Sequence, residues 1–170
     1  MINILEMGTT FRHNRLLATL YSRIDNWLND NKSILTLEQI ALCYLGKYQE
    51  TDFAELLTGL EETSLNLYNV VYPDLMLFKN NPYIANKELT RFAGRPDLII
   101  EVWSDANTQK EMMFKKSLYS TSSITEHWYL TQTSNIIECW IGKKRINDKN
   151  LNDILYTKTG IEIDIRHLSL

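Results

Sequence analysis

The sequence predicts an α/β (α+β) protein, because helical and strand patterns both occur along the chain. Apolar residues recur at helical spacing from Phe11 to Leu28, and an apolar run with frequent β-branched residues extends from Leu98 to Val102. A second helical pattern and a pair of strand patterns follow that run. We expect a single domain over residues 1–170, because the chain can bury one sizeable core but is short for two domains.

The N-terminal helix is the clearest element, and the segment after it is the least defined. The apolar positions within Phe11 to Leu28 are Leu16, Leu17, Leu20, Tyr21, Ile24, Trp27 and Leu28. Residues 34–60 support no single assignment. Ile34 to Leu37 suits the start of a strand, whereas Thr36 to Gln39 has the pattern of a helix capping box. We therefore expect mixed structure there.

Two strands are expected on either side of a loop. The segment from Val70 to Phe78 is typical of a strand and carries Asp74. Lys79 to Arg95 contains an Asn-Asn-Pro sequence and Gly94, which favour a loop. The strand that begins near Leu98 follows, so the two strands joined by this loop could be neighbours in one sheet.

The second half of the chain continues the mixed pattern. Ser104 to Thr108 offers several N-cap candidates for a helix that reaches about Ser120. Trp128 to Leu130 and Ile136 to Ile141 are separated by a short polar segment and predict a hairpin. Ile161 to Ile165 alternates between apolar and acidic residues, which predicts a half-exposed strand.

A carboxylate in the middle of the apolar strand needs a chemical explanation. Burial of Glu101 costs free energy unless a cation, a hydrogen-bond donor or water meets it. The alternative is an edge strand on which Glu101 faces solvent. Asp97 lies four residues earlier, ~13 Å away along the strand, too far for both to hold one metal ion. Asp74 from an adjacent strand is the better partner, and Asp97 then marks the start of the strand.

One combination of motifs extends over nearly the whole chain. It consists of His13, Pro73-Asp74, Pro96 to Ser104, Lys115, Tyr119, Glu126-His127-Trp128, and Ile161 to Ile165. In order and spacing this combination resembles the Uma-type family of putative restriction endonucleases, which belongs to the PD-(D/E)XK phosphodiesterase superfamily.

The resemblance implies a restriction-endonuclease-like fold, in which helices flank a mixed central sheet with additional hairpin strands. It also implies that Asp74 and Glu101 bind a metal ion, Mg²⁺ or Mn²⁺. The superfamily's lysine is expected two residues after the glutamate, where this chain has Trp103. The family is thought to move that lysine to the following helix, where Lys115 occupies the matching position.

Several further residues are candidates for lesser roles. Lys116 is a less favoured substitute for its neighbour Lys115. His13 at the start of the first helix is expected to border the cleft as an auxiliary residue, although a lone histidine there is more often a surface or cap residue. Asp97 is a second auxiliary candidate. The only dense basic cluster, Lys143, Lys144 and Arg145, is either a solvated turn or a weak contact for a nucleic-acid backbone.

Composition limits the possible partners and location. The net charge of −3 means that the chain lacks the basic field of a non-specific nucleic-acid binder. No basic, apolar leader and no membrane-length apolar run occurs, so we expect a cytoplasmic protein without a membrane partner. The spacing of Cys43 and Cys139 suits neither a metal site nor a disulfide framework, so both are expected to be buried, reduced thiols.

Three functions remain open at this point. The first is a Mg²⁺- or Mn²⁺-dependent nuclease that hydrolyses DNA, with Asp74, Glu101 and Lys115 as catalytic residues. The second is a nuclease-like binding or regulatory module without activity, which the acidic charge balance favours. The third is a metal-dependent enzyme that acts on another phosphoester. A homodimer is compatible with the first two, although the sequence identifies no interface.

Overall fold

A mixed sheet forms the centre of the computed structural model, which describes residues 11–28, 33–37, 41–44, 70–79, 83–84, 91–104, 107–123, 125–131, 134–164 and 166. Within these residues the strand order is β1-β4-β7-β8-β9-β10, and β11 also pairs with β9. Strands β7 and β8 are parallel, and the other pairs are antiparallel. The strands are β1 (Ile34–Leu37), β4 (Leu75–Phe78), β7 (Leu98–Trp103), β8 (Glu126–Thr131), β9 (Ile136–Ile141), β10 (Lys144–Arg145) and β11 (Lys149–Asn150).

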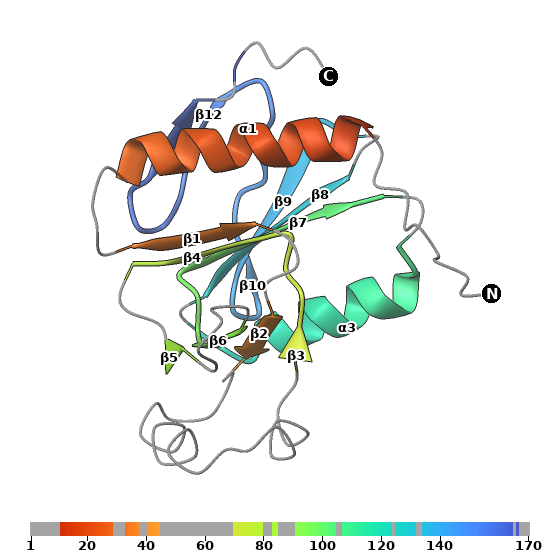
Figure 1. Ribbon diagram of the computed structural model, residues 1–170. Helices are drawn as coiled ribbons and strands as arrows, with labels where there is room; N and C mark the ends of the chain where they lie inside the picture. Colours follow the sequence, from red (N-terminus) through yellow and green to blue (C-terminus); the bar gives the residue numbers. More distant parts are fainter. Residues whose placement is uncertain are drawn as a thin grey trace, which may run out of the picture.

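Two helices lie on opposite sides of this sheet, as the resemblance implies. Helix α1 (Phe11–Leu28) crosses one face, and α3 (Gln109–Tyr119) lies on the other side with a small second sheet (Figure 1). The second sheet has the order β3-β2-β6-β5. Its strands are β3 (Val70–Val71), β2 (Ala41–Tyr44), β6 (Arg91–Gly94) and β5 (Tyr83–Ile84). Each face of the central sheet therefore has its own apolar core cluster.

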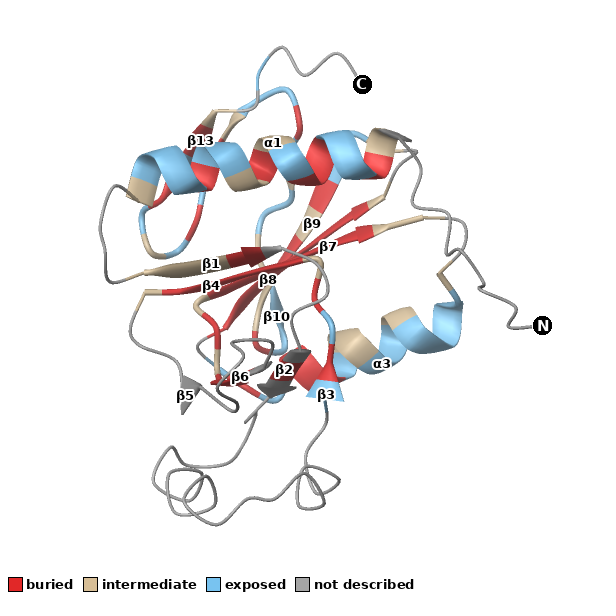
Figure 2. Ribbon diagram, viewed as in Figure 1, coloured by how far each residue is buried: buried red, intermediate tan, exposed pale blue. Residues whose placement is uncertain are grey.

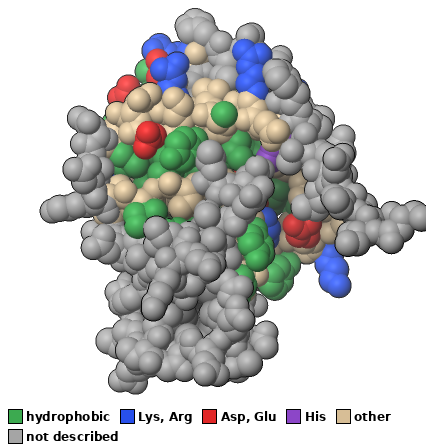
Figure 3. All heavy atoms as spheres, viewed as in Figure 1, with side chains coloured by type: hydrophobic (Ala, Val, Ile, Leu, Met, Phe, Trp, Pro, Cys, Tyr) green, Lys and Arg blue, Asp and Glu red, His purple; other side chains and the backbone are tan. Residues whose placement is uncertain are grey.

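Helix α1 has the bounds that its sequence pattern predicts. Leu16, Leu20 and Ile24 are almost fully buried, because their spacing puts them on the one stripe that faces the sheet. Figure 2 shows buried and exposed residues alternating along the helix. Figure 3 has the same view as Figure 1. In it, hydrophobic side chains gather below α1, and charged side chains lie on the outer side of this helix.

Strand β7 is the centre of the sheet and not an edge. It pairs with β4 on one side and with β8 on the other, and apolar layers cover both of its faces. Five of its six residues are buried, and Glu101 is only 1% exposed. The alternative of a solvent-facing Glu101 on an edge strand is therefore wrong.

The segment from Val70 to Arg95 differs from the sequence expectation. The strand expected from Val70 to Phe78 is interrupted at Pro73, which has no N–H for a ladder, so β3 and β4 belong to different sheets. The loop expected from Lys79 to Arg95 contains β5 and β6. These short strands pair with each other, and β6 also pairs with β2 from far along the chain. Strands this short leave no clear periodicity in the sequence. The neighbouring positions of β4 and β7 confirm the expected pairing across this loop.

Other local expectations are confirmed where the structure describes them. Ile34 to Leu37 is a strand, and the rest of the alternative helical cap lies outside the described residues. Thr108 caps α3 by accepting a hydrogen bond of 3.2 Å from the Glu111 N–H. The predicted hairpin corresponds to β8 and β9, and the last predicted strand to β13 (Glu162–Asp164), which pairs with β12 (Ile154–Tyr156).

The sequence also gave expectations for the two cysteines and for a membrane crossing. Cys139 is a buried free thiol, whereas the side chain of Cys43 lies outside the described residues. Among the described helices, none combines the length and the apolar character that a membrane crossing requires.

Candidate functional site

The bend before β4 places a carboxylate beside the end of β7. The Asp74 Oδ2 atom accepts a hydrogen bond of 2.6 Å from the backbone N–H of Val102. The strand register pairs Leu75 with Ile100, so Asp74 comes next to Glu101 across the two strands. The Asp74 side chain is 18% exposed. It therefore stands between the core and solvent at the edge of the sheet where β7 ends.

Glu101 is buried, but both of its carboxylate oxygens have a hydrogen-bond donor. Oε1 accepts a hydrogen bond of 2.7 Å from the Tyr119 hydroxyl, and Oε2 accepts one of 2.9 Å from the Lys115 ammonium. The pKa of Glu101 is raised to about 7, chiefly by burial; the charge of Asp74 acts in the same direction, while Lys115 and Tyr119 act in the opposite direction. The fold therefore holds a carboxylate that sits close to its titration point near neutral pH.

Lys115 links the buried glutamate to the bend that carries Asp74. Its Nζ atom donates to Glu101 and also, over 2.9 Å, to the backbone carbonyl of Tyr72. Burial alone would lower the pKa of Lys115, but the attraction of Glu101 and its hydrogen bond outweigh burial and raise it. The side chain therefore stays an ammonium at neutral pH and acts as a donor, not as a base.

His13 lies near the same carboxylate from the side of α1. Its Nε2 atom is 3.6 Å from the Asp74 Oδ2 atom, and the residue is buried. The other ring nitrogen lies 3.3 Å from the Asn14 side-chain oxygen. The first turn of α1 thus places an imidazole at the border of the site, as expected for an auxiliary position.

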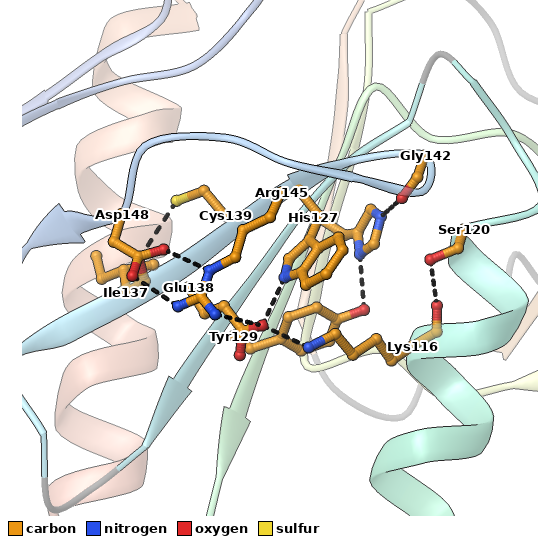
Figure 4. Close-up of polar contacts among 11 residues, drawn as sticks. Lys116, Ser120, His127, Tyr129, Ile137, Glu138, Cys139, Gly142, Arg145 and Asp148 are labelled. Atoms are coloured by element: carbon orange, nitrogen blue, oxygen red, sulfur yellow. Dashed lines mark hydrogen bonds and ion pairs between the residues drawn. The ribbon is translucent and has the colours of Figure 1, made fainter.

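Lys116 is one residue from Lys115 but is directed elsewhere. It forms an ion pair with Glu138 on β9, and its Nζ atom lies 4.3 Å from the ring centroid of Trp140 and 5.3 Å from that of Tyr129. Figure 4 shows Lys116 directed toward Tyr129 and Glu138. Burial alone would raise the pKa of Glu138, but hydrogen bonds from Lys116 and Trp140 lower it. The structure does not bring Lys116 to Glu101.

Asp97 lies at the other end of β7. Its Oδ2 atom accepts a hydrogen bond of 2.8 Å from the Lys79 N–H, and its backbone N–H donates to Leu77 over 2.8 Å. These contacts fix the chain where β7 begins, in agreement with the expected position at the start of the strand. The structure does not bring Asp97 together with Asp74 and Glu101.

The basic cluster is also separate from the two carboxylates. Because β7 and β8 are parallel and β9 is antiparallel to β8, the β9–β10 turn lies at the edge where β7 begins. Lys143, Lys144 and Arg145 are exposed there. Arg145 forms an ion pair of 2.7 Å with Asp148 and lies 3.8 Å from Glu138. The structure therefore does not bring this cluster to Asp74 or Glu101.

The site has contributors for which the sequence patterns predicted no role. Tyr119 donates to Glu101, the Tyr72 carbonyl accepts from Lys115, and the Val102 N–H fixes Asp74. The two backbone contacts have no residue-type signal. Tyr119 does have one, because its position four residues after Lys115 puts both side chains on one face of a helix.

Comparison with known proteins identifies the family. A family model with the description "Putative restriction endonuclease", named Uma2, matches residues 3–147. The chain belongs to the Uma2 family. The match includes α1, both carboxylates and α3, so the resemblance expected from the motifs is confirmed. A comparison with curated proteins gave no significant match.

The fold of this Uma2 protein is also found in a solved structure. It is similar to the crystal structure of a putative nuclease belonging to DUF820 from Anabaena variabilis, with a TM-score of 0.65 at 12% sequence identity. The similarity covers 92% of this chain and 79% of that one. At this identity the likeness shows the fold alone, and it confirms the expected mixed central sheet between helices.

Proposed function

We propose that this protein is a Mg²⁺- or Mn²⁺-dependent nuclease that hydrolyses phosphodiester bonds of DNA in the cytoplasm. The observation that carries the proposal is the convergence of Asp74, Glu101 and Lys115 at the end of β7. The family description and the nuclease fold support the same reaction class. In this proposal Asp74 and Glu101 hold the metal ion, and Lys115 orients the attacking water.

The donor set fits a hard divalent cation. Mg²⁺ prefers oxygen ligands and is commonly held by one or two carboxylates while it keeps several waters. A carboxylate has about four lone-pair positions, and Tyr119 and Lys115 occupy two of those on Glu101. Among the described residues no group of three or more His, Cys, Asp and Glu side chains could hold a metal ion. Water and substrate oxygens would therefore complete the coordination.

Charge balance supports the same assignment. Ionised Asp74 and Glu101 carry two negative charges, and Lys115 neutralises only one of them. Asp74 raises the pKa of Glu101 through like-charge repulsion, which a divalent cation between the two would relieve. When bound, the cation would lower the pKa of a coordinated water and neutralise charge on the phosphate.

The side chains of the protein would have distinct roles in hydrolysis. Lys115 is held as a donor between Glu101 and the Tyr72 carbonyl, so it is suited to orient a water and to stabilise negative charge on a phosphate oxygen. It is not suited to remove a proton, because its ammonium form is favoured. His13 beside Asp74 would keep that carboxylate directed toward the site.

Plasmid cleavage is the direct test of this function. We would incubate supercoiled plasmid and Mn²⁺ with the wild type, Glu101→Gln and Lys115→Met, which preserve side-chain size. We expect each substitution to lower the cleavage rate by ~100-fold or more, as expected for loss of a group that stabilises the transition state. Lys110→Met is the matched control, because Lys110 is exposed on the same helix, and it should cleave at the wild-type rate.

The other outcomes separate the remaining functions. Equal activity in all four proteins would point to a contaminating nuclease and would contradict the proposed site. If no protein cleaves and the wild type does not bind Mn²⁺ in a titration, the nuclease-like module without activity is the better description. Cleavage of simple phosphate esters but not of plasmid would favour the metal-dependent phosphoesterase.

A further inference from the structure

Helix α3 contacts Glu101 through two side chains, and only one of them has a role so far. Lys115 and Tyr119 are four residues apart, so they project from the same face of the helix on successive turns. Lys115 takes Oε2 of Glu101 and Tyr119 takes Oε1. The two donors therefore hold the two oxygens of one carboxylate from one rigid element.

Tyr119 is well placed to fix an orientation. The residue is fully buried and belongs to the apolar cluster on the α3 side of the sheet. Its ring lies edge-on to that of His127 at a centroid distance of 6.1 Å. A tyrosine has two side-chain torsions and a planar ring, so burial leaves its hydroxyl little freedom. Lys115, in contrast, has a flexible four-carbon stem.

The hydroxyl of Tyr119 removes a freedom that Lys115 alone would leave. A carboxylate held by one donor at one oxygen can still rotate about its terminal torsion, which is a broad, soft torsion for glutamate. A second donor at the other oxygen fixes the carboxylate plane. Groups that hold a metal-binding carboxylate in this way commonly change metal affinity when they are removed.

We propose that Tyr119 is a positioning residue that fixes the carboxylate plane of Glu101 and thereby sets the affinity of the site for its divalent cation. It contacts neither water nor phosphate in this role and acts only through Glu101. The inference rests on the proposed function, because it requires that Glu101 be a metal ligand.

A second buried tyrosine offers a matched control. Tyr129 lies beside Glu101 in the sheet register, on β8, and its hydroxyl lies 2.7 Å from the Nδ1 atom of His127 instead of the glutamate. Tyr119→Phe and Tyr129→Phe each delete a buried hydroxyl that contacts a buried polar side chain. They differ in whether that side chain is Glu101 or His127.

The test is the affinity for Mn²⁺, measured by calorimetric titration on the full chain without DNA. We expect Tyr119→Phe to weaken Mn²⁺ binding by ~10-fold or more, the range for loss of a group that orients a metal ligand. Tyr129→Phe should stay within about twofold of the wild type, because it leaves Glu101 untouched. In plasmid cleavage, Tyr119→Phe should raise the Mn²⁺ concentration that gives the half-maximal rate. The factor of this increase should be larger than the factor by which the rate at saturating Mn²⁺ falls.

Each contrary result has a distinct meaning. A wild type that binds no Mn²⁺ would overturn the proposed function, and the inference with it. A wild type that binds, with unchanged affinity in Tyr119→Phe, would overturn the inference alone. An equal loss in both variants would show general loosening of the core and would also overturn it. If circular dichroism finds Tyr119→Phe unfolded, all titrations are repeated in trimethylamine N-oxide, which favours the folded state. A variant that stays unfolded in this solvent would show that Tyr119 is needed for folding, which would overturn the inference.

Discussion

Glu101 and His127 are both buried, and burial favours the neutral form of each, but the two residues have different hydrogen-bond partners. Glu101 is met by an ammonium and a phenol, which offset part of the cost of burying its charge. His127 lies between two neutral partners, the Tyr129 hydroxyl at 2.7 Å and the Gly142 carbonyl at 3.0 Å (Figure 4). A carbonyl can only accept, so the Nε2 atom of His127 carries a proton. Because the lowered pKa of His127 makes the ring neutral at pH 7, Nδ1 accepts from the Tyr129 hydroxyl.

The buried imidazole predicts a pH dependence of stability. Burial lowers the pKa of His127 from 6.5 to about 4, and nearby Lys116 contributes in the same direction. As the pH falls below 6.5 the unfolded chain binds a proton that the folded chain does not, so stability is lost between pH 6.5 and about 4. Between pH 7.5 and 5 this one group should lower the free energy of unfolding by about 2 kcal/mol.

Urea unfolding of the wild type and of His127→Gln at both pH values tests this expectation. The pKa values of Glu101 and Glu126 are raised, which has the opposite effect on stability, but both residues are present in both proteins. We therefore expect the variant to lose about 2 kcal/mol less than the wild type between the two pH values. An identical loss would mean that the imidazole is already protonated in the folded state.

At the scale of elements, α3 is fixed to the sheet by two consecutive lysines. Lys115 reaches Glu101 on β7, and Lys116 reaches Glu138 on β9. The strand register aligns both glutamates with Tyr129 on β8. The ring of Tyr129 thus lies between the two carboxylates and beneath the Lys116 ammonium. These contacts set the rotation of α3 and with it the direction of Lys115.

Loss of the Lys116 contact should affect both stability and activity. We expect Lys116→Met to lower the free energy of unfolding by about 1–2 kcal/mol, through the loss of one charged hydrogen bond and of the aromatic contacts. Plasmid cleavage should fall several-fold, because Lys115 is less firmly placed. Lys110→Met on the exposed side of α3 is the control. Wild-type stability in Lys116→Met would show that the ion pair contributes nothing to fixing the helix.

At the scale of the whole molecule, the two ends of β7 carry different chemistry. The end with Glu101 joins Asp74 and Lys115, whereas the end with Asp97 lies beside the basic β9–β10 turn. A net charge of −3 leaves no general basic field. Substrate phosphate at the carboxylates would therefore be held by the site and not by Lys143 and Lys144.

This separation predicts a limited effect of the basic turn. Lys143→Ala combined with Lys144→Ala should leave the cleavage rate at saturating plasmid within about twofold of the wild type, because the turn lies at the edge of the sheet where β7 begins and not where the carboxylates lie. Any loss should appear as weaker DNA binding at low salt, with the salt-dependence slope reduced by at most about 2. A large loss of rate at saturating plasmid would place the turn within the active site.

The elements with local patterns could be predicted from the sequence. The 3.6-residue period of α1, the apolar run of β7 and the β8–β9 hairpin follow from side-chain spacing alone, and the structure confirms them. The motif order also identified the family, and with it the pair Asp74 and Glu101. Residues 45–60, which belong to the segment without a single assignment, lie outside the described residues.

The partners of the charged residues on these elements depend on contacts between distant parts of the chain. Whether Glu101 was buried depended on what covers the second face of β7, and that cover includes β2 and β6, which pair across a long stretch of chain. Lys115 and Lys116 are adjacent and chemically identical, yet one turns to Glu101 and the other to Glu138. Consecutive helix positions point about 100° apart, so the rotation at which α3 docks on the sheet assigns each lysine its partner, and that rotation depends on contacts between distant parts of the chain.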